Sequence, residues 1–275
     1  MGRLSLSIEY DSLVSAGTDT AQYSLREPEY PERVSIDRDL DWDGCFNVRD
    51  LGGLRTSDGR VTRWGAIVRA DSLDRLTPVG WSALKAHGIR TIVDLRNDDE
   101  LGISADRRQA DVNLKHVPLD DLADASFWGY WTSGPQFGTP LYYRPFLERK
   151  PERCAAALAT VARADPGGVV INCGGGRDRT GLVALLLLAL VGAEPDEIAS
   201  DYELSYERMR SLYAEHGEED QGPMIREYLR GEKTSARGII LDILATMDLK
   251  SCLLTAGLTR DDVSAIRTRL LGIGV

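Results

Sequence analysis

The stretch Val169-Val170-Ile171-Asn172-Cys173-Gly174-Gly175-Gly176-Arg177-Asp178-Arg179-Thr180-Gly181 decides how this chain folds. Its apolar start predicts a buried strand, and Thr180 opens a strongly apolar helix predicted over 180–192. The three glycines between them allow the backbone to curl until successive N–H groups face one centre, where the helix N-terminus adds positive potential. The sequence therefore predicts a loop that cradles a phosphate group.

Two side chains of this loop carry the predicted chemistry. Cys173 stands where the positive potential favours the thiolate, which is the nucleophilic form of cysteine. Arg179, six residues later, can fold back and offer a planar fork to two phosphoryl oxygens. The alternative is a glycine-rich turn around a buried structural cysteine. We favour the phosphate loop because strand, glycines, arginine and helix start are independent requirements that are met together.

Outward from the loop, short apolar runs alternate with helical patterns, and the C-terminal part is helical throughout. Strands are predicted at 66–70, 91–95, 114–119 and 169–172, and helices at 78–87, 140–149, 151–164, 180–192, 195–213, 223–230, 236–247 and 259–271. The aromatic stretch 124–140 is predicted to be a loop or lid whose rings mainly pack on the core. The fold class is therefore α/β, with a central, mostly parallel sheet flanked by helices on both faces and a helical C-terminal half.

One domain is expected over 1–275, with 1–44 as a lead-in that holds a short strand near 4–8 and 205–275 as a helical extension packed on the rest.

The net charge of -10 argues against a nucleic-acid partner and weakens the case for a lipid surface, since both attract basic patches. The four cysteines lack metal-ligand spacing, so we expect neither a metal site nor disulfides. We also expect no signal peptide, no membrane insertion and a cytoplasmic location. The oligomeric state stays open.

The charged positions near the predicted strand ends are expected to brace the fold. A network of ion pairs is more common in such places than a set of reacting groups. The residues concerned are Arg49, Asp50, Arg69, Asp71 and Arg96.

The loop also resembles the Cys-x5-Arg protein tyrosine phosphatase superfamily, and within it the bacterial tyrosine and lipid phosphatases with a His-Cys-x-x-Gly-Lys-Asp-Arg-Thr loop. The similarity extends over about residues 40–205. It includes Phe46-Asn47-Val48-Arg49-Asp50-Leu51-Gly52-Gly53, Arg69-Ala70-Asp71, Gly88-Ile89-Arg90-Thr91-Ile92-Val93-Asp94-Leu95-Arg96 and Ala199-Ser200-Asp201-Tyr202. The resemblance implies a phosphatase-type α/β sheet, Cys173 as nucleophile, Arg179 as phosphate clamp, and no metal or cofactor.

By the same resemblance, the substrate would be held by Gly174, Gly175, Gly176, Arg177, Thr180 and Asp94. Two positions depart from the subgroup. Asn172 replaces the histidine before the nucleophile and cannot be cationic. Arg177 replaces a lysine, which exchanges a compact ammonium for a fork and points to a different substrate preference.

The proton donor is left among four aspartates. Asp121 follows a strand exit, where this superfamily commonly places its mobile acid, and it is our first choice. Asp120 is its neighbour and can substitute. Asp178 lies inside the loop and can orient the site or donate the proton. Asp94 ends a central strand, and a structural partnership with Arg69 or Arg96 is an equal possibility for it.

These observations predict a metal-independent phosphomonoesterase that acts through a cysteinyl-phosphate intermediate. Its substrate would be phosphotyrosine on a protein or a small-molecule phosphate monoester. The alternative is a catalytically weak phosphate-binding module, a pseudophosphatase, which is suggested by Asn172 in place of histidine. A third possibility, a sulfurtransferase-like or redox role for Cys173, uses the same thiolate, but the Asp178-Arg179-Thr180 sequence argues against it.

Overall fold

A five-stranded sheet forms the centre of the part of the chain that the computed structural model describes, residues 38–101 and 111–272. The strand order is β1-β2-β5-β3-β4, and every pair is parallel except β1 with β2. The strands are β1 (Arg49–Asp50), β2 (Ile67–Ala70), β3 (Ile89–Asp94), β4 (Asn113–His116) and β5 (Gly168–Asn172). The predicted mostly parallel sheet is thus confirmed, with β5 at its centre.

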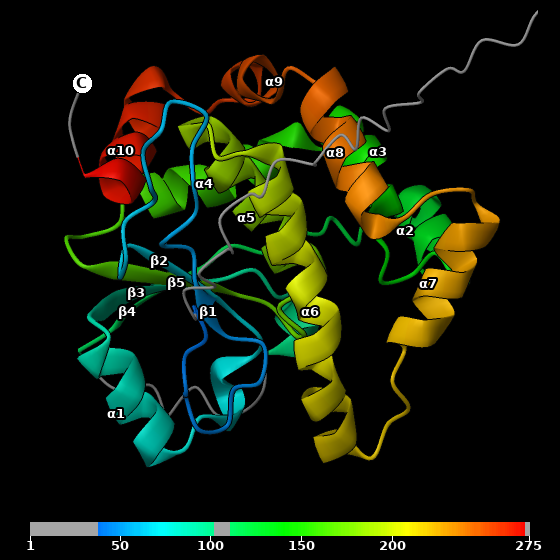
Figure 1. Cartoon of the computed structure of the whole chain (residues 1–275), viewed down its shortest axis with the longest axis horizontal. Helices are drawn as coiled ribbons and strands as arrows, with labels where there is room; N and C mark the ends of the chain where they lie inside the picture. Colours follow the sequence, from blue (N-terminus) through cyan, green and yellow to red (C-terminus); the bar gives the residue numbers. More distant parts are fainter. Residues whose placement is uncertain (1–37, 102–110, 273–275) are drawn as a thin grey trace, which may run out of the picture. The chain divides into compact units, whose positions relative to one another are not determined.

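Helices cover the sheet on both faces (Figure 1). They are α1 (Pro78–Ala86), α2 (Ala125–Trp131), α3 (Tyr143–Arg149), α4 (Pro151–Ala162), α5 (Asp178–Val191), α6 (Pro195–His216), α7 (Gly222–Gly231), α8 (Ala236–Thr246), α9 (Leu249–Thr255) and α10 (Arg260–Leu271). None of the described helices is both long and apolar enough to span a bilayer.

Alternation along the strands builds two separate cores. Ile67 and Ile171 point to the face covered by α4 and α5. Val68 and Val170 point to the other face, where they pack with residues of α1. Because consecutive side chains of a strand lie on opposite faces, a strand that is apolar at every position must be covered twice. This is why the continuous apolar run of β5 occupies the middle of the sheet.

The helices α1 and α10 each begin at a capping threonine. The Thr77 hydroxyl accepts a hydrogen bond from the Gly80 N–H at the start of α1. Thr259 and Asp262 form a reciprocal capping box at the start of α10. β4 lies at the sheet edge, where the proline that follows it is tolerated.

Two predictions need correction, and one helix was missed. The segment 124–140 is helical in part: Asp124 caps α2, and the rings of Phe127 and Trp128 pack against Phe146. The helix α9, capped by Asp248, was not predicted, because its seven residues are too short for a periodic signal. The helix after the phosphate loop begins at Asp178, two residues earlier than expected. The strand predicted near 4–8 lies outside the described residues.

Candidate active site

The glycine-rich loop connects β5 to α5 at the carboxyl end of the central strand, as predicted. Cys173 follows β5 directly and is buried. Gly176 adopts φ +67°, and a Cβ atom there would stand 2.6 Å from the Ala70 carbonyl oxygen. Only glycine fits this position without moving the neighbouring strand. The tight turn at Gly176 brings Asp178 to the start of the helix.

The loop carbonyls are held on its outer side. The Gly174 carbonyl accepts a hydrogen bond from the Ser72 N–H at 3.0 Å. The Gly175 carbonyl accepts one from Asn47 Nδ2 at 2.9 Å, and the Gly176 carbonyl accepts one from Arg69 Nη2 at 2.8 Å. No backbone N–H of 174–177 donates a hydrogen bond within the described parts of the chain. These N–H groups are therefore free to bind an anion.

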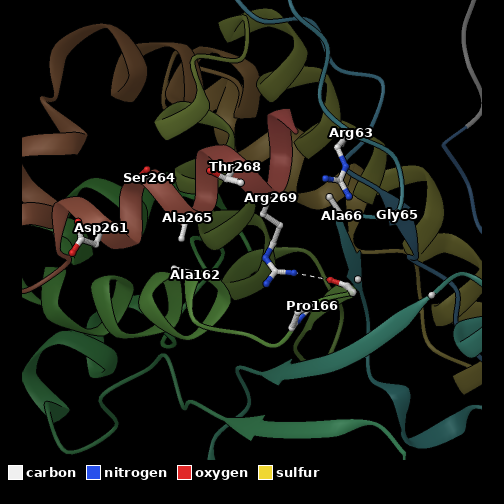
Figure 2. A pocket seen from close by; sticks show the side chains of 13 residues that line it. Arg63, Gly65, Ala66, Ala162, Pro166, Asp261, Ser264, Ala265, Thr268 and Arg269 are labelled. Atoms are coloured by element: carbon white, nitrogen blue, oxygen red, sulfur yellow. Dashed lines mark hydrogen bonds between the residues drawn. The ribbon is translucent and has the colours of Figure 1, made fainter. Parts of the chain in front are cut away.

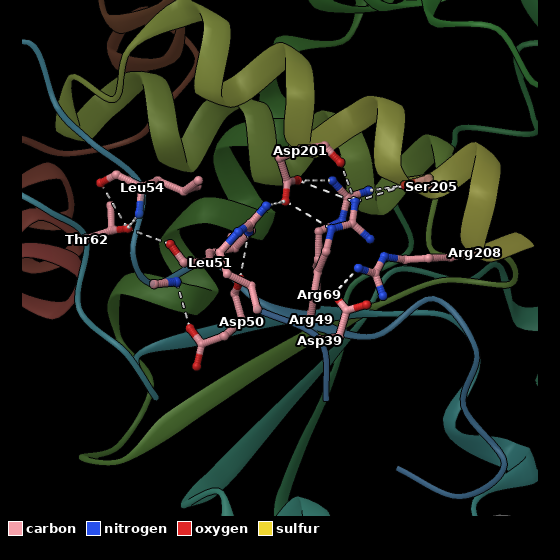
Figure 3. A network of polar contacts seen from close by, with 12 residues as sticks. Asp39, Arg49, Asp50, Leu51, Leu54, Thr62, Arg69, Asp201, Ser205 and Arg208 are labelled. Atoms are coloured by element: carbon pink, nitrogen blue, oxygen red, sulfur yellow. Dashed lines mark hydrogen bonds and ion pairs between the residues drawn. The ribbon is translucent and has the colours of Figure 1, made fainter. Parts of the chain in front are cut away.

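A buried ionic network holds Arg69 in place (Figure 3). Asp201 of α6 pairs with Arg38, Arg49 and Arg69 at 2.9, 3.0 and 2.5 Å. Burial alone would raise the pKa of Asp201, but the three guanidinium groups hold it well below its usual range. Arg69 thus links the carboxylate of α6 to the Gly176 carbonyl of the loop.

The bracing roles expected for the charged strand-end residues are confirmed. Asp71 accepts hydrogen bonds from the Phe46 and Asn47 N–H groups and pairs with Arg75. Asp50 accepts from the Gly52 and Gly65 N–H groups. Arg96 pairs with Asp94 and Asp74.

Asp94, predicted to contact the substrate, pairs with a neighbouring arginine. It is 3% exposed, and its carboxylate is 2.8 Å from Arg96 Nη2. Of the two structural partners considered for Asp94, Arg69 and Arg96, the structure shows the ion pair with Arg96. The physical reason is local: Arg96 lies two residues along the chain and its guanidinium and backbone N–H both reach the Asp94 carboxylate.

Arg179 lies over the loop with both terminal nitrogens engaged. Its Nη2 is 2.7 Å from Glu100 Oε2, its Nη1 donates to Glu100 Oε1, and the same Nη1 is 3.4 Å from Asp120 Oδ2. Burial would lower the pKa of Arg179, but Glu100, Cys173 and Asp120 raise it above its ordinary value. The clamp predicted for phosphate thus faces two carboxylates and the nucleophile.

Glu100 was not singled out by the sequence patterns. It ends a short 3-10 helix, where Asn97 holds it through backbone and side-chain hydrogen bonds of 3.0 and 2.9 Å. Burial opposes its ionisation, but the hydrogen bonds and charge of Arg179 lower the pKa of Glu100 below its usual value. The only sequence signal that could have pointed to Glu100 was the N-capping pattern from Asn97 to Glu100, which comes directly after the strand that carries Asp94.

Of the neighbouring aspartates, Asp120 lies at the site and Asp121 does not. Asp121, our first choice for the acid, pairs with Lys150 at 2.8 Å and Arg153 at 3.3 Å. The hydrogen bond from Lys150 lowers its pKa, which keeps it ionised. Burial, with help from the nearby negative charges of Glu100 and Asp178, instead raises the pKa of Asp120 to about 6, against the opposing effect of Arg179. The two residues are adjacent, so the direction of each side chain decides which of them meets the loop.

Arg177 and Asp178 form the other wall of the loop. Arg177 is buried, its Nε is 3.3 Å from Asp178 Oδ1, and its guanidinium lies 5.7 Å from the centre of the Tyr206 ring. Its Nη1 also donates to the Tyr213 hydroxyl at 3.3 Å. The fork that replaces the subgroup's lysine is thus held by α6, and it presents a fixed positive charge beside the loop.

The aromatic segment 124–140 reaches Arg177 at its end. Gly138 adopts φ +75°, and a Cβ atom there would be 2.3 Å from Arg177 Nη2. Trp128 and Trp131 pack against Tyr142, as the packing interpretation expected. Tyr130 and Phe137, by contrast, are 60% and 57% exposed.

The side chains of Asn172 and Thr180 are buried, and their polar atoms have no hydrogen-bond partner within residues 38–101 and 111–272. In the same ranges, no three His, Cys, Asp or Glu side chains come together in an arrangement that could hold a metal ion.

A cysteine beneath an arginine fork, in a loop whose N–H groups are free to bind an anion, defines the cysteine-dependent phosphatases as the class of this protein. Comparison with known proteins agrees. The model of the tyrosine phosphatase family matches residues 40–272, so this chain belongs to the tyrosine phosphatase family.

Three relatives carry names of the same kind. A protein of Cupriavidus necator, named provisionally as a tyrosine-protein phosphatase, is 29% identical over 189 residues, which are 66% of this chain and 68% of the relative. A tyrosine-protein phosphatase of Nostoc commune is 31% identical over 51% of this chain and 48% of its own length. The triple specificity protein phosphatase PtpB of Mycobacterium tuberculosis is 28% identical over 62% of this chain and 70% of its own. These names support phosphatase activity and do not support the alternative of a catalytically weak binding module.

Proposed function

We propose that this phosphatase hydrolyses phosphate monoesters through a cysteinyl-phosphate intermediate, with Cys173 as nucleophile, Arg179 as phosphate clamp and Asp120 as general acid. The observation that carries the proposal is the position of Arg179, which is 3.4 Å from Asp120 and near enough to Cys173 for the thiolate charge to help raise the pKa of the guanidinium. Nucleophile, clamp and a carboxyl group of raised pKa therefore meet at one loop.

In the first step, the Cys173 sulfur attacks phosphorus and an S–P bond forms as the P–O bond to the leaving group breaks. Asp120 gives its proton to the leaving oxygen. In the second step, water attacks phosphorus, Asp120 takes one of its protons, and the S–P bond breaks to release inorganic phosphate and the thiolate. The N–H groups of 174–177 and the fork of Arg179 stabilise the phosphoryl oxygens in both steps.

The contact between Arg179 and Glu100 has to open for this chemistry. A bound phosphoryl group competes with the Glu100 carboxylate for the same two guanidinium nitrogens. Since Glu100 is itself anchored by Asn97, it stays close to Arg179 when this contact opens. We assign Glu100 the role of a positioning residue for Arg179.

The substrate class that fits this site is phosphotyrosine or a small aromatic phosphate monoester. Exposed aromatic side chains, Tyr130 and Phe137, belong to the segment that contacts Arg177 through Gly138. Such rings suit an aromatic leaving group or an apolar flank of a peptide. The Mycobacterium tuberculosis relative is named as a triple specificity protein phosphatase. From this name we propose for this chain only that its substrates include phosphoproteins.

The test is hydrolysis of para-nitrophenyl phosphate in the presence of a chelator, with the native chain, Cys173→Ser and Cys252→Ser. We expect turnover by the native chain that falls to the uncatalysed background in Cys173→Ser, because a serine hydroxyl is not ionised at neutral pH. Cys252→Ser is the matched control: it makes the same change at a half-buried cysteine on α9 and should keep native activity.

A Cys173→Ser variant that still turns over, or native activity that is lost with chelator and restored by a metal ion, would contradict the proposal. Phosphate binding without any turnover would instead restore the binding-module alternative.

A further inference from the structure

A second cavity lies at the end of the sheet opposite the phosphate loop, with a volume of about 760 Å³. Its lining includes Ala66 and Gly88, which precede β2 and β3, and Gly168, the first residue of β5. Cys173 follows the other end of β5. A strand advances about 3.3 Å per residue, so the five residues from Gly168 to Cys173 span roughly 16 Å. The cavity is therefore separate from the active site.

Two arginines line this cavity, Arg63 from the connection between β1 and β2 and Arg269 from the end of α10 (Figure 2). Neither of them pairs with a carboxylate anywhere in residues 38–101 and 111–272. The one acidic lining residue, Asp261, lies eight positions before Arg269, about 12 Å away along the helix. Two positive charges thus share one cavity in a protein of net charge -10.

Part of the role of Arg269 is structural. Its Nη1 donates to the Gly167 carbonyl at 2.6 Å, and its Nη2 donates to the Ala164 carbonyl at 2.6 Å. These bonds hold the turn between α4 and β5. Its buried Nε has no hydrogen-bond partner in the described structure. Burial and the nearby charge of Arg63 both lower the pKa of Arg269, so the pair carries an electrostatic cost.

Arg63 has no corresponding structural explanation. Its backbone N–H bonds to the Leu270 carbonyl at 2.7 Å, which fixes the position of the residue, but its guanidinium forms no hydrogen bond within the described residues. The left-handed Gly272 leaves room for this side chain, since a Cβ there would stand 3.0 Å from Arg63 Cδ. The exposed side chain of Arg63 is therefore placed beside a second positive side chain, without a counter-ion among the described residues.

We propose that this cavity binds a phosphate group, free or carried by a small molecule, between Arg63 and Arg269. Guanidinium forks match the oxygen geometry of phosphate, and an anion offsets the repulsion between the two side chains. Ser264 and Thr268, one helical turn apart on α10, line the same cavity and offer hydroxyl donors (Figure 2). Ala162, Ala265 and Pro166 form an apolar wall that suits the organic part of a small phosphoester.

Equilibrium dialysis with radiolabelled inorganic phosphate tests the proposal on the full chain. We expect two equivalents per native chain, one at the phosphate loop and one at the cavity. In Arg63→Gln, the second site should weaken about 10- to 100-fold, which corresponds to the loss of one charge-assisted contact. Arg60→Gln removes the same charge three residues earlier, from a side chain paired with Asp58 outside the cavity, and should keep both sites.

Crystals soaked in selenate locate the sites independently of affinity. An anomalous peak between Arg63 and Arg269 that disappears in Arg63→Gln is the expected result. The peak at the phosphate loop serves as an internal control and reports on the proposed function separately. Competition by phenylphosphonate, a non-hydrolysable organic analogue, distinguishes the sources: tighter binding than phosphate at the cavity assigns it to an organic phosphate, and equal or weaker binding assigns it to free phosphate. A single peak at the loop, or a cavity peak unchanged in Arg63→Gln, overturns the proposal.

Discussion

Asp120 and Asp121 are adjacent in sequence but have opposite surroundings. Asp120 faces Arg179 from a buried position, whereas Asp121 is ion-paired with Lys150 and Arg153. A general acid must hold a proton at working pH and reach the leaving group. With its pKa raised to about 6 mainly by burial, Asp120 holds its proton at mildly acidic pH, whereas the lowered pKa of Asp121 keeps that residue ionised.

We predict that Asp120→Asn lowers kcat/KM by roughly 10²- to 10⁴-fold, the usual contribution of general acid catalysis. Since Asp120 must be protonated to act, native activity should fall as pH rises through about 6, and this alkaline limb should be absent in Asp120→Asn. The measurement is the pH dependence of kcat/KM on phenyl phosphate, whose poor leaving group needs the proton most.

Asp121→Asn is the matched control, because it makes the same change one residue away and should keep the native pH profile. If Asp121→Asn loses the alkaline limb and Asp120→Asn keeps it, the acid is the residue that the strand-exit pattern favoured. In that case the side chains near the loop would have to rearrange when substrate binds.

At the scale of elements, Asp201 joins α6 to the sheet and the loop. Its three arginine partners are Arg38, which precedes the sheet, Arg49 of β1 and Arg69 of β2. Arg69 also donates a hydrogen bond to the Gly176 carbonyl of the loop. Buried ion pairs contribute little compared with apolar packing, but removal of one partner leaves the others as uncompensated buried charges. The network therefore fixes the positions of these elements and makes them sensitive to a single substitution.

We predict that Asp201→Asn lowers the free energy of unfolding by about 3–5 kcal/mol. The pKa of Asp201 is held below its value in the unfolded chain, so its stabilisation is complete above about pH 4 and is lost as pH falls further. The difference in stability between native chain and variant should therefore shrink on acidification. Chemical denaturation at several pH values measures it.

Glu203→Gln is the control for this experiment. Glu203 lies on the same helix, and its pair with Arg237 is partly exposed, with side chains 41% and 33% exposed, so its loss should change stability by less than about 1 kcal/mol. Equal losses in the two variants, at all pH values, would contradict the special role of Asp201.

At the scale of the molecule, the C-terminal helices share a core with the sheet. Ile266 of α10 is fully buried in the cluster that also contains Ile171 of β5 and Leu186 of α5. We propose that the described part of the chain behaves as one domain, with the helices after residue 205 as part of it rather than as a separate unit.

Ile266→Ala should accordingly lower the free energy of unfolding by about 2–5 kcal/mol, the usual cost of a large-to-small change in a core. The whole transition should shift while it remains single. Thermal unfolding followed by tryptophan fluorescence and by loss of activity gives two probes that should coincide. Separate transitions would show that α10 and the phosphate loop belong to different cooperative units.

Local patterns in the sequence determined most of the secondary structure and the centre of the site. The apolar run of β5, the glycines after Cys173 and the apolar helix behind them are consecutive, so their geometry follows from short-range chain properties. The capping residues Thr77 and Thr259 marked helix starts for the same reason. The family relationship followed from motifs of this local kind.

Only the tertiary structure decided which distant side chains meet the loop. Glu100 reaches Arg179 across 79 positions, and Asp201 reaches Arg69 across 132. Asp120 and Asp121 cannot be separated by composition or spacing, because the direction of each side chain depends on how the chain leaves β4. Arg63 and Arg269 likewise come together only when α10 packs beside the start of the sheet. Long-range contacts depend on how whole helices and strands pack together, and local sequence patterns do not specify that packing.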